Sequence, residues 1–279
     1  MKNSLKFQLR SLLSSRSFNI VFIISVVFAV IPTVFYGITF YGADINSVPA
    51  AYSFFIASTY ISEFNRIYYI IFPLIVAVPF ADSYYTDLKS KTIYAVLSKC
   101  SIKNYYYGKL ICVFFSGFII IALPMLINFL LNLAVFPTDS TVEFLYGFGQ
   151  IQNQLFISAE DSDPILFYKL FCTNQYLYEL AFLFTSAFFG GLLACAVYQL
   201  SFFWRASRIL LNCILFIIVN LLSLVSNYLP VNMNLSSYIF AGNIWSSPSY
   251  AGFALTISLC AAAAVLPAPF AMKRMNNIL

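Results

Sequence analysis

The sequence contains no histidine and few charged residues, and these two shortages exclude most soluble classes of protein. Charged residues make up 9% of the 279 residues, whereas hydrophobic residues make up 61%. An average soluble domain carries about 25% charged and about 45–50% apolar residues. A water-soluble domain needs more charge than this to cover its surface, so the composition excludes a soluble enzyme and a disordered chain. It predicts an all-α integral membrane protein.

The sequence also has no Cys-x-x-Cys pair, and its six cysteines are scattered. Five of them fall in or beside apolar runs, so we interpret them as small packed hydrophobic residues. Without histidine a zinc site is not expected. The phosphate-binding pattern G-x-x-x-x-G-K-[ST] is absent as well. We therefore expect a chain that holds no metal and no cofactor of its own and is not an enzyme.

Uncharged stretches between ionisable residues indicate where a bilayer fits. Stretches of 27, 29, 25 and 64 uncharged residues follow Arg16, Lys109, Glu179 and Arg208. A spanning helix needs about 20 apolar residues, so the longest stretch holds two helices. The 15 uncharged residues after Arg66 are too few, so that span is expected to begin earlier, near Ala57. The prediction is one transmembrane domain over residues 1–279 with six spans, near 18–40, 57–81, 106–136, 177–200, 207–228 and 250–271.

Basic residues gather in the connections that would lie on one side of the membrane. These are the N-terminus, the connections after the second and fourth spans, and the C-terminus. They hold 13 of the 15 Lys and Arg residues, leaving Arg66 and Lys169 on the other side. The positive-inside rule predicts cytoplasmic termini in a multi-pass protein of the plasma membrane, with residues 137–176 as an extracellular loop. The Lys and Arg residues form short separate clusters and no continuous basic face, which also argues against a nucleic-acid partner.

Residues 1–17 carry an amphipathic pattern before the first span. Leu5, Leu9, Leu12 and Leu13 share one helical face, and the Lys and Arg residues fall mainly elsewhere around the wheel. This pattern predicts an interface helix on the cytoplasmic leaflet, where the cations also meet anionic lipid. The alternative is a positively charged flank that only fixes the topology.

Residues 82–105 form the one substantial cytoplasmic connection. Asp87 and Lys91 have the spacing of an i,i+4 pair on a helix surface. Ile93, Val96 and Leu97 follow as an apolar stripe. A short helix with one charged and one apolar face is typical of a docking element, so we expect a coupling helix here. The alternative is a solvated loop.

At this connection the sequence resembles the membrane subunits of type-2 ABC transporters, mostly bacterial exporters. Members of that family typically carry a threonine-leucine helix, a turn, basic residues, a tyrosine and a Gly-Lys pair entering the third span. The corresponding residues are Thr92, Leu97-Ser98, Lys103, Tyr105 or Tyr106, and Gly108-Lys109. Lys91 and Cys100 depart from the family, which often has glycine and proline there. Six spans, both ends inside and an N-terminal amphipathic helix extend the resemblance over nearly the whole chain.

The resemblance implies a permease subunit of an ATP-binding-cassette exporter. Such a subunit works as a dimer, a homodimer in the simplest case, with a separate ATPase that binds ATP and Mg. The interface helix and the coupling helix would rest on that ATPase, through Asp87, Lys89, Lys91, Thr92 and Lys99. The implied cargo is hydrophobic or amphipathic, such as a peptide toxin, a bacteriocin or an antimicrobial. The alternatives are the substrate-binding membrane subunit of a vitamin-type importer and a self-contained secondary carrier.

The other polar residues of the predicted spans divide into two groups. Glu63 and Arg66 lie near the outer boundary of the hydrocarbon with i,i+3 spacing. They are candidates for an outer gate, the alternative being a snorkelling interfacial pair. Asn128, Asn132 and Gln199 lie deeper and are expected to hydrogen-bond neighbouring helices, and Gly190-Gly191 is expected to allow close helix packing. No deeper charge exists, which disfavours an ion-coupled carrier. The uncharged connection 229–249 is a candidate for a segment that dips into the bilayer.

Overall fold

The computed structural model describes residues 2–58, 63–79, 83–98, 100–139, 166–203, 208–226, 228–229, 231–241 and 249–276. Helices dominate these residues, which contain no β-strand, so the all-α fold is confirmed. The helices, in chain order, are α1 (Lys2–Leu13), α2 (Arg16–Thr39), η1 (Ile45–Ser47), η2 (Ala51–Phe54), α3 (Glu63–Ala77), α4 (Ser83–Lys89), α5 (Thr92–Leu97), α6 (Ile102–Val135), α8 (Tyr168–Thr173), α9 (Gln175–Phe203), α10 (Arg208–Ser226), α11 (Ser236–Ile239), α12 (Tyr250–Val265) and α13 (Ala268–Asn276).

Among the described residues, four helical segments are long and apolar enough to cross a membrane. They are α2, α6, α9 and the α12–α13 segment Tyr250–Asn276. α3 and α10 are apolar but shorter. The helix of the second predicted span begins later than expected, because Ala57 lies in a turn and α3 starts at Glu63. Of the predicted loop 137–176, residues 140–165 lie outside the described residues.

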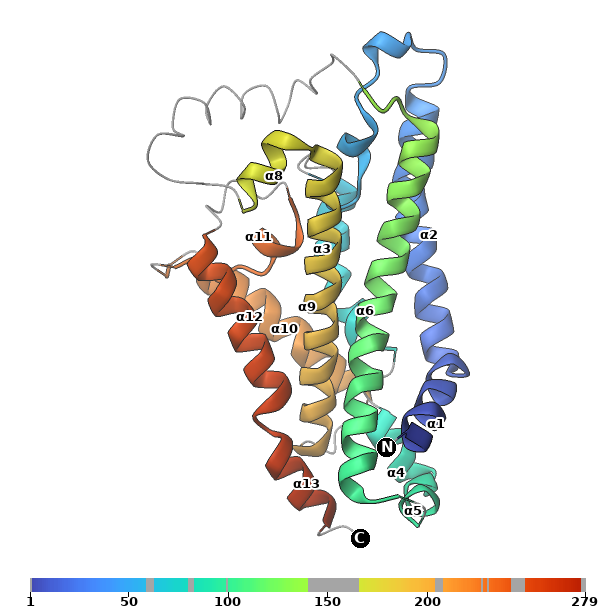
Figure 1. Cartoon of the computed structure of the whole chain (residues 1–279), viewed down its shortest axis with the longest axis vertical. Helices are drawn as coiled ribbons and strands as arrows, with labels where there is room; N and C mark the ends of the chain where they lie inside the picture. The colour runs from blue at the N-terminus through green and yellow to red at the C-terminus, as the bar shows by residue number, and fades with distance from the viewer. Residues whose placement is uncertain are drawn as a thin grey trace.

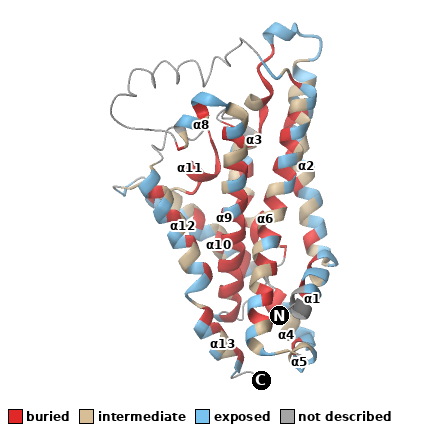
Figure 2. Cartoon of the chain, in the orientation of Figure 1, coloured by how far each residue is buried: buried red, intermediate tan, exposed pale blue. Residues whose placement is uncertain are grey.

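The long helices lie side by side along the length of the molecule (Figure 1). α6 and α9 occupy the centre, with α2 on one side and α12 on the other. We call the end that holds α1, α4, α5 and α13 the basal end, and the end that holds η1, η2 and α8 the apical end. Figure 2 shows buried residues concentrated along α6 and α9, whereas α2 and α12 expose much of their surface.

Two glycines allow α6 and α9 to approach each other closely. A Cβ atom added at Gly117 would lie 2.5 Å from the carbonyl oxygen of Gly190. In return, a Cβ atom at Gly190 would lie 3.0 Å from the carbonyl oxygen of Gly117. Small residues at such a crossing bring helix backbones together, which is a main source of helix association where water cannot drive it. The expected packing role of Gly190 is confirmed.

Asn128 and Asn132 of α6 tie that helix to α2. Thr33 Oγ1 donates to Asn132 Oδ1 over 2.6 Å, and Asn128 Nδ2 donates to the carbonyl oxygen of Ala29 over 2.8 Å. Asn128 Oδ1 in turn accepts the main-chain N–H of Ile56 over 2.9 Å. The two amides therefore satisfy buried polar groups of neighbouring segments, as the sequence predicted.

The connection that follows α10 folds back among the helices. Residues 235–241 are buried throughout. Ser186 Oγ of α9 donates to the carbonyl oxygen of Ile239 over 2.6 Å, and the N–H of Ala241 donates to the carbonyl oxygen of Ala57 over 2.9 Å. Non-helical backbone at membrane depth is tolerated where protein covers it and satisfies its polar groups. The non-helical residues Phe240 and Ala241 are covered in this way, and the dip of the connection 229–249 into the bilayer stays a prediction.

The Gly117 crossing gives a stability prediction. Gly117→Ala places a Cβ atom against main-chain atoms of α9, which cannot move as a flexible side chain can, so we expect a loss of about 1–3 kcal/mol. The matched control is Gly37→Ala in α2, where the nearest atom, in the Val135 side chain, lies 3.6 Å away. Thermal unfolding in detergent should show a lower melting temperature for Gly117→Ala alone. Equal melting temperatures for the two variants would contradict the close crossing.

Candidate functional site

The connection expected to carry a coupling helix forms two short helices. α4 ends at Lys89, and Lys91 adopts a left-handed conformation with φ 59° before α5 begins at Thr92. Ser90 Oγ donates to the carbonyl oxygen of Thr86 over 2.8 Å and so satisfies an acceptor of the last turn of α4. Asp87 and Lys91 therefore do not lie one turn apart on a helix, and the expected i,i+4 pair is wrong.

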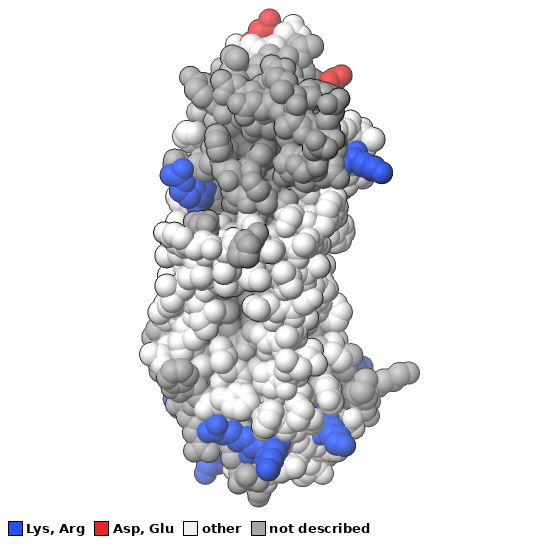
Figure 3. Space-filling view, turned by 90° about the vertical axis from the view of Figure 1, so that its left-hand side faces the viewer, with Lys and Arg blue, Asp and Glu red and all other residues white. Residues whose placement is uncertain are grey.

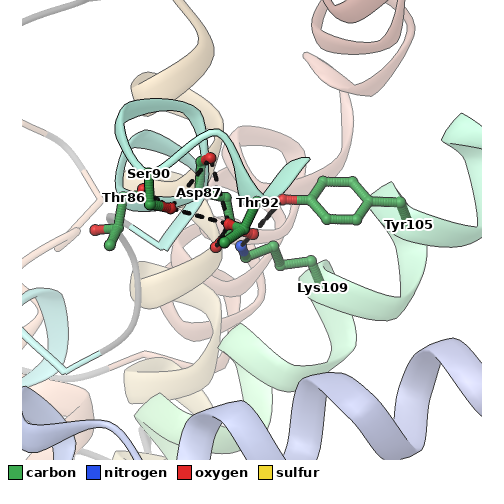
Figure 4. Close-up of polar contacts among 6 residues, drawn as sticks. All are labelled: Thr86, Asp87, Ser90, Thr92, Tyr105 and Lys109. Carbon is green, nitrogen blue, oxygen red and sulfur yellow. Dashed lines mark hydrogen bonds and ion pairs between the residues drawn. The ribbon is translucent and has the colours of Figure 1, made fainter. Parts of the chain in front are cut away.

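Asp87 instead faces the first turns of α6 (Figure 4). Lys109 Nζ donates to Asp87 Oδ2 in a salt bridge, and Tyr105 Oη donates to the same oxygen over 2.6 Å. Lys109 Nζ also lies 3.1 Å from Tyr105 Oη and 5.2 Å from the centre of that ring. A carboxylate of α4 and two side chains one turn apart on α6 thus form one cluster.

Burial makes this ion pair a strong constraint. The Lys109 side chain is 1% exposed and that of Asp87 is 25% exposed. Removing an ammonium group from water costs several kcal/mol unless an opposite charge and hydrogen bonds compensate it. Asp87 supplies the charge, and Tyr105 supplies an additional hydrogen bond and a cation–π contact. The position of α4 is therefore fixed to α6 by the need to neutralise Lys109.

Thr92 belongs to the same cluster. Its Oγ1 lies 3.4 Å from both the main-chain oxygen and Oδ1 of Asp87, and 3.0 Å from Ser90 Oγ. These contacts hold the turn between α4 and α5. Of the predicted coupling residues, the structure brings together Asp87 and Thr92, and it leaves Lys89 and Lys91 exposed. Lys99 lies outside the described residues.

The apolar face of the helical pair packs on the bundle. Ile93 is buried, and Val96 and Leu97 pack against the same core, as the stripe predicted. Tyr84 of α4 stacks on Phe202 of α9, with ring centres 4.0 Å apart. α4 and α5 are therefore anchored to both central helices, while their basic residues point away from the bundle.

α1 lies at the same end of the molecule, the basal end (Figure 1), and packs chiefly on α6. It ends at Leu13 and is separate from α2, which Ser15 caps. Leu12 is buried against the bundle, whereas Leu9 and Leu13 are exposed. The expected single leucine face is thus divided, because part of it contacts protein and part is exposed, and its contact with a lipid leaflet stays a prediction.

The predicted outer-gate residues lie far from this cluster. Glu63 is the first residue of α3, and its side chain lies outside the described residues. Arg66 is exposed. Their pairing as a gate stays a prediction.

Charged side chains lie toward the two ends of the molecule (Figure 3). On the face drawn, many Lys and Arg side chains gather at the basal end, the described residues of the middle band are uncharged, and further basic side chains lie with the acidic ones toward the apical end. Asp87 is the one acidic residue that the structure describes at the basal end, and Lys109 neutralises it. The exposed charge that the described residues place at this end is therefore positive.

Sequence reasoning named Tyr105 and Lys109 only as parts of a family pattern and missed their role. Lys109 directly precedes the long uncharged stretch of the third predicted span, yet it is buried. Its i,i+4 spacing from Tyr105 was the available signal, because it places the two side chains on one face of α6. Glu179, also treated as a flank, is 1% exposed within the first turns of α9.

The Asp87–Lys109 pair gives a second stability prediction. Asp87→Asn leaves the buried ammonium group without its counter-charge, and we expect a loss of about 3–5 kcal/mol. The double variant Asp87→Leu/Lys109→Leu removes both charges and should recover much of this loss. The loss of stability in Asp87→Asn and its recovery in the double variant are measured by melting temperature and by protease cleavage within residues 83–98.

Lys103→Met is the matched control, because Lys103 is an exposed cation of α6, the helix that carries Lys109. It should leave both readouts unchanged. If Asp87→Asn behaved like Lys103→Met, the ion pair would not hold α4 in place.

Comparisons with protein-family models, with curated proteins and with solved structures give no match for this chain.

Proposed function

We propose that this chain is the permease subunit of an ATP-binding-cassette exporter. The observation that supports it best is the anchored helical pair α4–α5. One face is fixed to the two central helices through Asp87 and Tyr84, and the other carries the exposed cations Lys89 and Lys91. An element held in this way is suited to receive a push from a separate protein and pass it into the bundle.

The contacts suggest how a push would travel. Movement of α4 pulls on α6 through the Lys109 salt bridge and on α9 through Phe202. α6 and α9 are packed closely at Gly117 and Gly190, so they would move as one body. Their displacement relative to α2 and α12 would switch access from one side of the membrane to the other, which is a rigid-body transition of a familiar kind.

The charge pattern favours a basal end that lies in the cytoplasm, since cations collect on that side of membrane proteins. In this orientation six spans cross the plasma membrane, with α3 and α10 as the two shorter ones and both termini inside. α1 would lie along the inner leaflet, with Lys6 and Arg10 near anionic headgroups. The helical pair α4–α5 would then face a cytoplasmic partner.

The partner that we propose is an ATPase subunit, which would bind ATP and Mg because this chain has no phosphate-binding loop. A second permease copy would complete the transporter. The cargo would be hydrophobic or amphipathic, with a peptide toxin, bacteriocin or antimicrobial as the leading class.

Charge reversal on the exposed face of α4–α5 tests the proposal. In Lys89→Glu/Lys91→Glu the cations that would meet the ATPase become anions, so we expect recovery of the ATPase with the tagged permease to fall at least about tenfold, in line with like-charge penalties at interfaces. Export should fall with it. Recovery is measured by quantitative mass spectrometry after purification in mild detergent.

The matched control is Lys273→Glu, another exposed cation of the basal end but one on α13. We expect it to keep most of the ATPase. Unchanged ATPase recovery and transport in the double variant would show that α4–α5 is not the coupling element.

A further inference from the structure

The helix α13 is separated from α12 by a break that contains two prolines. α12 ends at Val265 and α13 begins at Ala268. Pro267 and Pro269 have no N–H group, so neither can donate to the carbonyl oxygen four residues before it. The hydrogen-bond ladder of the helix is therefore interrupted twice, and helices bend where their ladder is interrupted. The junction thus has the local structure of a hinge.

The segments on the two sides of this break are attached to α9 in different ways. Before the break, Gln199 Nε2 donates to the carbonyl oxygen of Ala264 over 2.7 Å, and Gln199 is 1% exposed. After the break, Arg274 Nη1 donates to the carbonyl oxygen of Phe203, the last residue of α9, over 3.0 Å. This second bond is exposed, so another acceptor can reach the guanidinium group. α12 is clamped by a buried amide, whereas α13 is held by an accessible bond.

The apolar contact of α13 with the bundle is small. Its buried residues are Ala268, Ala271 and Met275, and the helix packs on α9 and α6. Two of the three are alanines, which bury little area, and hydrophobic stabilisation is proportional to the area buried. The one large aromatic side chain of α13, Phe270, is 67% exposed. Few buried apolar contacts are typical of an element that opens locally while the rest of the fold stays intact.

In a bilayer the basal end of α13 reaches the lipid headgroups. The helical segment Tyr250–Asn276 has 27 residues and rises about 40 Å, more than the hydrocarbon core of about 30 Å. The exposed Phe270 comes just before Lys273 and Arg274, so the change from hydrocarbon to headgroup falls within α13. A phosphate group is anionic and can accept two hydrogen bonds from one guanidinium group. It therefore competes well with the single neutral carbonyl group at the end of α9.

We propose that α13 is a hinged strap that an anionic phospholipid opens. In the closed position, which is that of the structure, Arg274 ties α13 to the end of α9. When a headgroup phosphate takes Arg274 from that carbonyl group, α13 turns about Pro267 and lies along the interface, with Phe270 toward the lipid chains. Gln199 keeps α12 in place. Opening the strap releases the contact that α13 makes with both central helices. The strap needs no ATPase, so it stands apart from the exporter proposal.

Distances between two spin labels in nanodiscs test the strap. The full chain carries the labels at Asn276→Cys in α13 and Ile24→Cys in α2, both exposed positions, after the accessible native cysteines are replaced by serine. The bilayer is phosphatidylcholine, alone or mixed with phosphatidylglycerol. A swing of about 45° moves the end of a nine-residue helix by about 10 Å. We expect phosphatidylglycerol to produce a second distance peak, displaced by several ångström.

The neighbouring cations of α13 provide a matched pair of variants. Arg274→Met removes the bond to Phe203, so the displaced peak should already appear in phosphatidylcholine, with an open fraction at least about threefold above that of the wild type. Lys273→Met removes an exposed cation but keeps that bond, and this variant should stay closed in phosphatidylcholine. Moving the label from Asn276 to Leu255 reports on α12, and this distance should not change with lipid. Melting temperatures near that of the wild type show that the variants fold.

Four results would overturn the proposal. Equal distances with and without phosphatidylglycerol in the wild type would mean that the strap stays closed. A closed Arg274→Met variant would mean that Arg274 is not the latch. A shift at Leu255 as large as that at Asn276 would mean that α12 and α13 move together and that the break is no hinge. Opening by inorganic phosphate in phosphatidylcholine nanodiscs would mean that a soluble anion is the ligand in place of a lipid.

Discussion

The buried ammonium group of Lys109 is the constraint on which the basal half of the molecule depends. An apolar bundle tolerates a cation only where a carboxylate and hydrogen bonds compensate it. Asp87 and Tyr105 provide that compensation, and Asp87 reaches Lys109 only if α4 lies against α6. The turn at Lys91, the start of α5 at Thr92 and the buried Ile93 then follow from the position of α4. A single charge thus determines where the connection between α3 and α6 is held.

The rest of the bundle uses a small number of polar contacts between apolar helices. α6 takes part in most of them: with α2 through Asn128 and Asn132, and with α9 through Gln199. Between these contacts, the glycine crossing at Gly117 and Gly190 gives close packing without polar groups. This distribution makes α6 and α9 a central pair to which the outer helices are attached. The proposed permease function would use this central pair to carry a push on α4 into the bundle.

Much of the fold could be predicted from the sequence, because hydropathy and charge spacing determine where helices lie in a membrane protein. The helices α2, α6, α9 and α12 appear close to their predicted ranges. The start of α3 could not be predicted, since residues 55–57 are apolar and yet Ile56 donates its main-chain N–H to Asn128 of a distant helix. Such a contact leaves no local signal.

The candidate site was predicted in part for a similar reason. Local patterns indicated Asp87, Thr92 and the apolar stripe from Ile93, because spacing along the chain reports which residues share a face. The partner of Asp87 is Lys109, which lies 22 residues away on another helix. From the sequence, the i,i+4 spacing of Lys91 favoured Lys91 as the partner instead. Lys91 itself adopts the left-handed conformation between α4 and α5, so it does not share a helix with Asp87. Neither glycine nor asparagine stood there to indicate such a turn.

The central claim is that α4–α5 receives force from an ATP-binding partner, and crosslinking in native membranes tests it most directly. A lysine-reactive crosslinker is applied to cells that express the tagged chain, and crosslinked peptides are identified after purification. We predict crosslinks from Lys89 or Lys91 to one ATP-binding protein, recovered in a one-to-one ratio with the chain. Recovery of the chain alone, with transport continuing in ATP-free vesicles under an ion gradient, would contradict the account and favour a secondary carrier.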